Sequence, residues 1–175
     1  MVFIETVLLS EHDGTLRFRV CSRALDGGER PDAVAQDLAE LDPRDPASLL
    51  HSTSWRFSGG SVVLTYVGLP DPWPDGDAPA VRPGVLAAGS EPLTPTPRQV
   101  SAVAVARHAC EHLAYLRYTD TVVAACASAA GDLWRLIDRF TPAPAGLLTA
   151  TRGGWLTRAR PRAMGRRYRG LRCAS

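Results

Sequence analysis

The first 21 residues alternate between apolar and polar positions in a way that predicts a β-hairpin. Residues 2–9 and 16–21 have the alternation of strands, and Asp13-Gly14 between them is typical of a two-residue turn. The apolar cross-strand pairs in this register are Leu9 with Phe18 and Val7 with Val20. We therefore expect an antiparallel pair of strands with one apolar face.

Residues 51–68 predict a second hairpin, with Gly59-Gly60 as its turn. The cross-strand pairs are then Phe57 with Val62, Trp55 with Leu64 and Thr53 with Tyr66. Bulky pairs on one face specify the register, because a slip of one residue would turn them to water. We therefore expect Trp55 to be buried in the core.

Helical periodicity appears in two places. Residues 31–41 predict a short helix whose apolar face is formed by Val34, Leu38 and Leu41. Residues 96–140 predict two antiparallel helices joined at residues 118–120. These two helices supply enough apolar surface to cover one face of a sheet.

The boundaries of the helical pair follow from capping signals. Thr96, Pro97 and Gln99 form a capping box with a proline at the first helical position. Thr119 or Asp120 is expected to cap the second helix, and Gly131 is a candidate break. The apolar stripes are Val105, Ala109, Leu113 and Leu116 on the first helix, and Val122, Cys126, Ala129, Ala130, Leu133 and Ile137 on the second.

Together these elements predict a single α+β domain over residues 1–140. A mixed or antiparallel sheet built from the two hairpins would be covered by the short helix and the C-terminal helical hairpin. Residues 70–97 are rich in proline and predict a long connection within the domain, which is either mobile or wraps the surface. Residues 141–175 predict an Arg-rich, disordered tail.

Charge is divided unevenly along the chain. All 20 basic residues are arginine, as is typical of a protein from a GC-rich bacterial genome. Residues 1–150 carry 12 Arg and 18 acids, a net −6, whereas residues 151–175 carry 8 Arg and no acid, a net +8. Such a tail favours nucleic-acid phosphates, an acidic membrane surface or a protein partner. The candidate nucleic-acid contacts are Arg158, Arg160, Arg162, Arg166, Arg167 and Arg169.

Four scattered cysteines, with no Cys-x-x-Cys spacing, indicate free thiols in a reducing compartment. The chain has no apolar run of the roughly 20 residues that a membrane span needs. The first residues acquire an acid at Glu5 and do not resemble a secretory signal. We therefore expect a cytoplasmic protein.

The densest group of chemically capable side chains is His108-Ala-Cys-Glu111-His112. It resembles the His-x-x-Glu-His pattern of inverted zinc peptidases, in which two imidazoles one helical turn apart bind zinc and the glutamate activates a water. His51 or His12 is the candidate third ligand. The structural alternative is that His108 and His112 border the core and hydrogen-bond to the sheet or the connection, with Glu111 solvated.

Residues 1–70 resemble a Nudix hydrolase domain in the order of their parts: hairpin, Gly-Gly loop, short acidic helix, hairpin. The stretch that matches the Nudix helix is Gln36-Asp37-Leu38-Ala39-Glu40-Leu41. The resemblance implies that Asp37 and Glu40 stand where the family binds magnesium beside a diphosphate. The arginine and the last glutamate of the family motif are missing here, so standard catalysis is expected to be lost.

The sequence therefore leads to a Nudix-like module that binds a small ligand or a protein partner of unknown identity. The enzymatic alternative is a metal-dependent hydrolase. It would use magnesium with Asp37 and Glu40 on a phosphorylated substrate, or zinc with His108, His112 and Glu111. Nucleic-acid binding through the tail is the third hypothesis.

Overall fold

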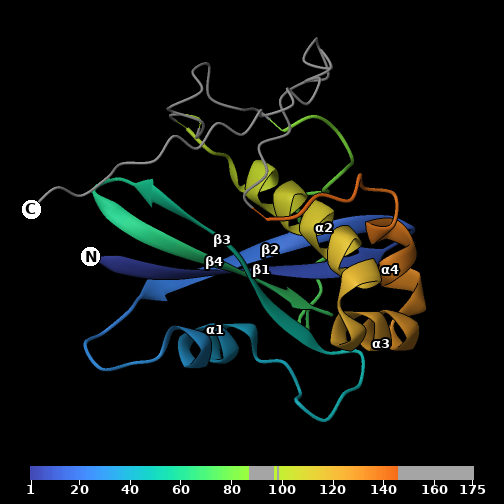
Figure 1. Cartoon of the computed structure of the whole chain (residues 1–175), viewed down its shortest axis with the longest axis horizontal. Coiled ribbons are helices and arrows are strands. Elements are labelled where there is room, and N and C mark those ends of the chain that lie inside the picture. The colour runs from blue at the N-terminus through green and yellow to red at the C-terminus, as the bar shows by residue number, and fades with distance from the viewer. Residues whose placement is uncertain (87–96, 98, 146–175) are drawn as a thin grey trace, which may run out of the picture.

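The computed structural model describes residues 1–86, 97 and 99–145, and it has the α+β architecture that the sequence predicts (Figure 1). Within these residues, four strands form one sheet and four helices pack against it. The strands are β1 (Val2–His12), β2 (Thr15–Ala24), β3 (Leu49–Ser58) and β4 (Ser61–Leu69). The helices are α1 (Pro31–Ala39), α2 (Ala102–Thr119), α3 (Thr121–Ala129) and α4 (Gly131–Ile137).

The sheet is mixed and has the strand order β2-β1-β4-β3. Both predicted hairpins form, and the register of the first is confirmed, with Leu9 opposite Phe18. In the second hairpin Trp55 is opposite Leu64 and Phe57 is opposite Val62, as predicted. The predicted pair of Thr53 with Tyr66 is wrong, because the register shifts between Ser52 and Ser54 and places Ser52 opposite Tyr66. The two hairpins join through β1 and β4, which run parallel. Because the two hairpins meet along β1 and β4, the outer strands β2 and β3 become the edges of the sheet.

Helices cover both faces of the sheet (Figure 1). On one face, α2, α3 and α4 bury the larger apolar cluster, with Trp134 only 1% exposed. On the other face, α1 covers a smaller cluster. The residues of that smaller cluster are Ile4, Val34, Ala35 and Tyr66, with Leu25, Leu38, Leu50 and Leu64 packed against it.

The first helix of the C-terminal pair begins later than the sequence predicts. Helix α2 starts at Ala102, and the Ser101 hydroxyl accepts a hydrogen bond from the Ala104 amide at 3.2 Å. Pro97 and Gln99 precede the helix, so the predicted start is wrong, and Thr96 lies outside the described residues. Ser101 offers the same kind of side-chain oxygen five residues further on, and its hydroxyl caps the helix.

The second predicted helix is divided in two. Asp120 caps α3 by accepting from the Val122 and Val123 amides, which confirms one of the two predicted caps. The helix stops at Ala130, and α4 starts at Gly131, the candidate break. Val123 is buried, whereas Val122 is 66% exposed, so the predicted stripe is wrong at Val122. Ala129 is also exposed, because α3 ends there.

The described part of the proline-rich connection, residues 70–86, wraps the edge of the sheet. The Phe18 amide donates to the Pro79 carbonyl at 3.1 Å, and the Val81 amide donates to the Leu16 carbonyl at 2.9 Å. At its start, Asp71 accepts two hydrogen bonds from the guanidinium of Arg19 on β2. This stretch therefore provides hydrogen-bond partners for some of the backbone N–H and C=O groups on the outer side of β2.

No helix in the described ranges is both long and apolar enough to cross a membrane. The sequence predicts a disordered tail from residue 141, which is wrong for residues 141–145, where Ala143 is buried. The Arg-rich part of the predicted tail, after residue 145, lies outside the described residues. Before it, residues 141–145 follow α4 back to α2, where the Ala143 amide donates to the Glu111 carbonyl at 3.1 Å.

Candidate functional site

The predicted zinc-binding histidines lie where α2 crosses β3. His51 on β3 points toward α2 and lies beside His112, with 5.3 Å between the two ring centroids. His112 also stacks near Tyr115, at 6.4 Å between centroids. Its Nδ1 accepts a hydrogen bond from the Ala145 amide at 3.0 Å. The sequence named His51 as a candidate third ligand, and the fold does bring it to His112.

The electrostatics of this cluster favour neutral imidazoles. Burial lowers the pKa of His51 and of His108 below the ordinary value of 6.5. Burial also lowers the pKa of His112, and the neighbouring His51 adds to this effect. A neutral His112 is the form that can accept the hydrogen bond from Ala145.

Glu111 is only 6% exposed, so the expectation of a solvated Glu111 is wrong. Residues 141–145 pass beside α2 at this position, which explains the burial. Burial raises the pKa of Glu111, opposed by the charge of Arg107. Across the described ranges, no three His, Cys, Asp or Glu side chains come together in a group that could hold a metal ion. The hydrogen bond that His112 accepts from the Ala145 amide attaches the chain that follows α4 to α2.

The two acids that correspond to the Nudix helix are both engaged with this chain. Asp37 is exposed on α1, 3.7 Å from the guanidinium of Arg23. Glu40 leaves the helix in a left-handed conformation with φ of 52°, and its carboxylate accepts from the indole N–H of Trp73 at 3.1 Å. The end of α1 thus directs these carboxylates to different partners.

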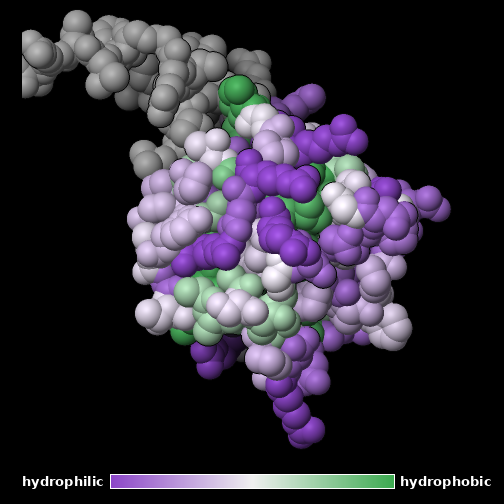
Figure 2. Space-filling view, turned by 90° about the vertical axis from the view of Figure 1, so that its right-hand side faces the viewer, coloured by the Kyte–Doolittle hydropathy of each residue, from purple (hydrophilic) through white to green (hydrophobic). Residues whose placement is uncertain are grey.

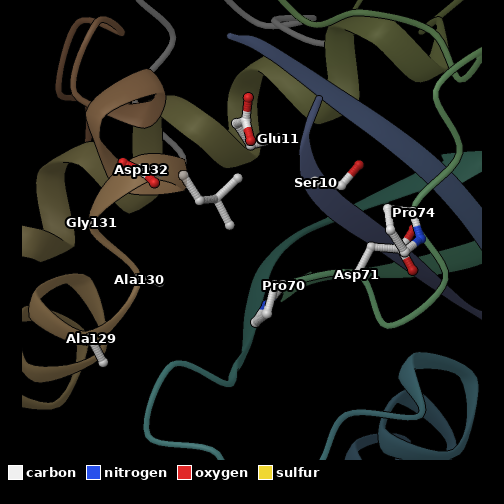
Figure 3. A pocket seen from close by; sticks show the side chains of 10 residues that line it. Ser10, Glu11, Pro70, Asp71, Pro74, Ala129, Ala130, Gly131 and Asp132 are labelled. Carbon is white, nitrogen blue, oxygen red and sulfur yellow. The ribbon is translucent and has the colours of Figure 1, made fainter. Parts of the chain in front are cut away.

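A hollow of about 340 Å³ lies at the carboxyl ends of the parallel strands β1 and β4 (Figure 3). Ligands of open α/β sheets bind at such strand ends. Its lining comes from the end of β1, the start of the proline-rich connection and the α3–α4 junction: Ser10, Glu11, Pro70, Asp71, Pro74 and Ala129 to Leu133.

The acids of this hollow are already partnered. Asp71 is held by Arg19 through two hydrogen bonds of 2.8 and 2.9 Å. Glu11 accepts from the Gly14 amide at 2.7 Å, and Asp132 pairs with Arg135. Because its charges are satisfied within the chain, the hollow offers little that would select a ligand.

The largest departure from expectation is on β3. Trp55 is 70% exposed and Phe57 is 69% exposed, so the prediction that Trp55 is buried is wrong. The register at these two residues is as expected, but β3 is an edge strand, and both rings lie beyond the part of the face that α1 covers. We call Trp55 and Phe57 the aromatic edge.

The aromatic edge continues the apolar layer beneath α1. Trp55 and Phe57 are opposite Leu64 and Val62, and directly opposite residues share a face of the sheet. Leu64 packs against the cluster that α1 covers. A different side of the molecule, bordered by α3 and α4, carries mainly hydrophilic side chains with small apolar areas between them (Figure 2).

Sequence reasoning missed the aromatic edge because the alternation of β3 is the same for an edge strand and a central one. One available signal was the row of polar residues on the other face of β3, namely Ser54, Arg56 and Ser58. The parallel pairing of β1 with β4, which places β3 outermost, could not be read from either hairpin alone.

The predicted nucleic-acid contacts, Arg158 to Arg169, lie outside the described residues, so that hypothesis stays a prediction. Comparison with protein-family models, with curated proteins and with solved structures found no significant match. The case for function therefore rests on the surface and the contacts described above.

Proposed function

We propose that this chain is a non-catalytic interaction module that binds an extended strand along β3. The observation that carries the proposal is the aromatic edge: two adjacent aromatic side chains, 70% and 69% exposed, on the outermost strand of the sheet. Exposed apolar side chains in a cluster are typical of interaction sites. An unpaired edge strand provides backbone groups for strand addition, and aromatic residues are frequent anchors of binding energy.

In this proposal, residues 1–70 are a Nudix-like module that has lost catalysis. Supporting this, Asp37 and Glu40 are paired with Arg23 and Trp73. The scattered cysteines support a cytoplasmic location for the module. The interaction function is preferred to the hydrolase because its surface is exposed and unpaired among the described residues, whereas the candidate acids have partners.

A displayed library of random peptides about ten residues long, matched to the usual length of a strand, tests the proposal. Selection uses the full chain, with counter-selection on a Trp55→Ser, Phe57→Ser double variant. Peptides with apolar residues at alternate positions are expected, and their binding should slow hydrogen exchange at the Trp55 and Phe57 amides. Trp73→Ser is the matched control, since Trp73 is 64% exposed but lies outside β3. The proposal is contradicted if every selected peptide binds the double variant as tightly as it binds the unchanged chain.

A further inference from the structure

The backbone of the aromatic edge faces outward. The Val62 amide donates to the Met1 carbonyl at 3.1 Å, on the β1 side of β4. Val62 therefore does not exchange hydrogen bonds with Phe57, its partner in the register. Paired residues in an antiparallel ladder alternate between exchanging both hydrogen bonds and exchanging none. Phe57 and, two residues earlier, Trp55 thus present their backbone N–H and C=O groups at the free side of β3.

The sequence of β3 at this place is symmetric in residue type. Ser54-Trp55-Arg56-Phe57-Ser58 has a serine at each end, an aromatic residue inside each serine and Arg56 at the centre. A two-fold axis relates identical surfaces, so residue i of one subunit meets j, and j meets i. An antiparallel pair of two such strands places serine against serine and aromatic against aromatic.

From this symmetry we propose that β3 pairs antiparallel with β3 of a second copy of this chain, with Arg56 on the two-fold axis. Trp55 then lies opposite Phe57 of the second copy, and both residues have outward backbone groups, as an exchanging pair requires. Joining the two edges produces one continuous sheet across the dimer. The inference rests on the proposed function and deepens it by naming the occupant of the edge.

The charge at the axis is compensated within each subunit. Two arginines would face each other there, which by itself is unfavourable. Each Arg56 guanidinium donates to both carboxylate oxygens of Glu5, at 2.8 and 2.7 Å. Each guanidinium is thus directed toward β1 of its own subunit, and the two arginines and two glutamates together are neutral on the face opposite the aromatic rings.

The buried area predicts a weak, reversible dimer. Large aromatic side chains bury about 150–250 Å² each, so four rings that are about 70% exposed supply several hundred Å². Stable interfaces bury about 1,200–2,000 Å² in total, so this contact is at the small end of the range. We expect a dissociation constant in the micromolar to millimolar range.

Sedimentation velocity of the full chain, over concentrations that reach the millimolar range, measures the association. Phe57→Pro removes the outward N–H together with the aromatic ring, at an edge position where proline is tolerated, and it should abolish dimer formation. Trp55→Ser, which leaves the backbone intact, should weaken the dimer at least about tenfold. Trp73→Ser should leave the dissociation constant unchanged. A full chain that stays monomeric throughout, or a dimer indifferent to both β3 variants, overturns the inference.

Cysteine cross-linking tests the register, in a background where Cys21 and Cys173 are serine. In this register Ser54 lies opposite Ser58 of the second copy, at a spacing that a disulfide can bridge. A mixture of the single variants Ser54→Cys and Ser58→Cys should form a heterodimeric disulfide, whereas each variant alone should not. Equal cross-linking of each variant alone overturns the register.

If the chain is monomeric while selected peptides still protect the β3 amides, the dimer fails and the proposed function stands. If neither occurs, both fail.

Discussion

At the scale of single residues, exposure separates tryptophans that look alike in the sequence. Trp134 is 1% exposed between the helices and the sheet, whereas Trp55 is 70% exposed. Trp134→Ala should lower the free energy of unfolding by about 3–5 kcal/mol, because it removes a buried ring and leaves a cavity. Trp55→Ala should change it by less than about 0.5 kcal/mol at low protein concentration. Urea denaturation measures both, and equal losses would contradict the assignment of the core.

The histidine cluster predicts a pH dependence of stability. Burial lowers the pKa values of His51, His108 and His112 in the folded chain, so the unfolded chain takes up protons first as the pH falls. Stability from these groups is complete above the unfolded pKa of about 6.5 and is lost as the pH falls below it. Melting temperatures between pH 7.5 and 5.5 should therefore decline on acidification.

Single histidine variants show which side chains cause this decline in stability at low pH. His51→Gln and His112→Gln should each reduce the decline, because each removes one group that protonates more readily in the unfolded chain. His12→Gln is the control, since His12 is exposed at the end of β1. Burial raises the pKa of Glu111, so its contribution to stability has the opposite sign and falls as the pH rises above the unfolded pKa of 4.5. A decline that survives both cluster variants would contradict the prediction.

At the scale of elements, helix ends depend on single side chains. One carboxylate oxygen of Asp120 accepts from the amides of Val122 and Val123, at 2.8 and 3.1 Å. Asp120→Ala should therefore cost about 1 kcal/mol of folding free energy, and Asp120→Asn should recover most of it. Urea denaturation of the two variants checks the expectation. A loss that Asn does not reduce would show that charge, rather than the cap, is what matters at this position.

At the scale of the whole molecule, the proline-rich connection is attached to the sheet by an ion pair whose carboxylate is buried. The Asp71 side chain is 1% exposed and binds the guanidinium of Arg19, whose side chain is 31% exposed. Asp71→Ala should cost about 1–3 kcal/mol, because it removes both hydrogen bonds that the carboxylate accepts from the Arg19 guanidinium. Hydrogen exchange at the Phe18 and Val81 amides should become faster, since both amides bond across this connection.

An exposed pair gives the comparison for Asp71. Arg23 binds Glu29 at 2.9 Å, and both side chains are 36% exposed. Arg23→Ala should lower the free energy of unfolding much less than Asp71→Ala does, because solvent screens an exposed ion pair. If the two variants lose equal stability, the connection is not anchored through Asp71.

The sequence by itself determined the local structure of this protein. Asp13-Gly14 and Gly59-Gly60 take the positive φ angles that two-residue turns require, so both hairpins and the pairs next to their turns could be predicted, whereas the shift at Thr53 could not. The helical periodicity and Asp120 gave the helical pair, and the two histidines spaced one turn apart identified a real cluster. These features depend on interactions among residues close in the chain, which is why one sequence suffices to find them.

Only the tertiary structure decided which surfaces meet. The parallel contact of β1 with β4 joins the hairpins, makes β3 an edge and leaves Trp55 at the surface. The return of residues 141–145 to α2 buries Glu111 and supplies the Ala145 amide to His112. An alternating strand has the same pattern at the centre of a sheet and at its edge, and a helical carboxylate has the same spacing whether or not another segment covers it. Burial depends on residues far away in the chain, and that information appears only when the layers are assembled.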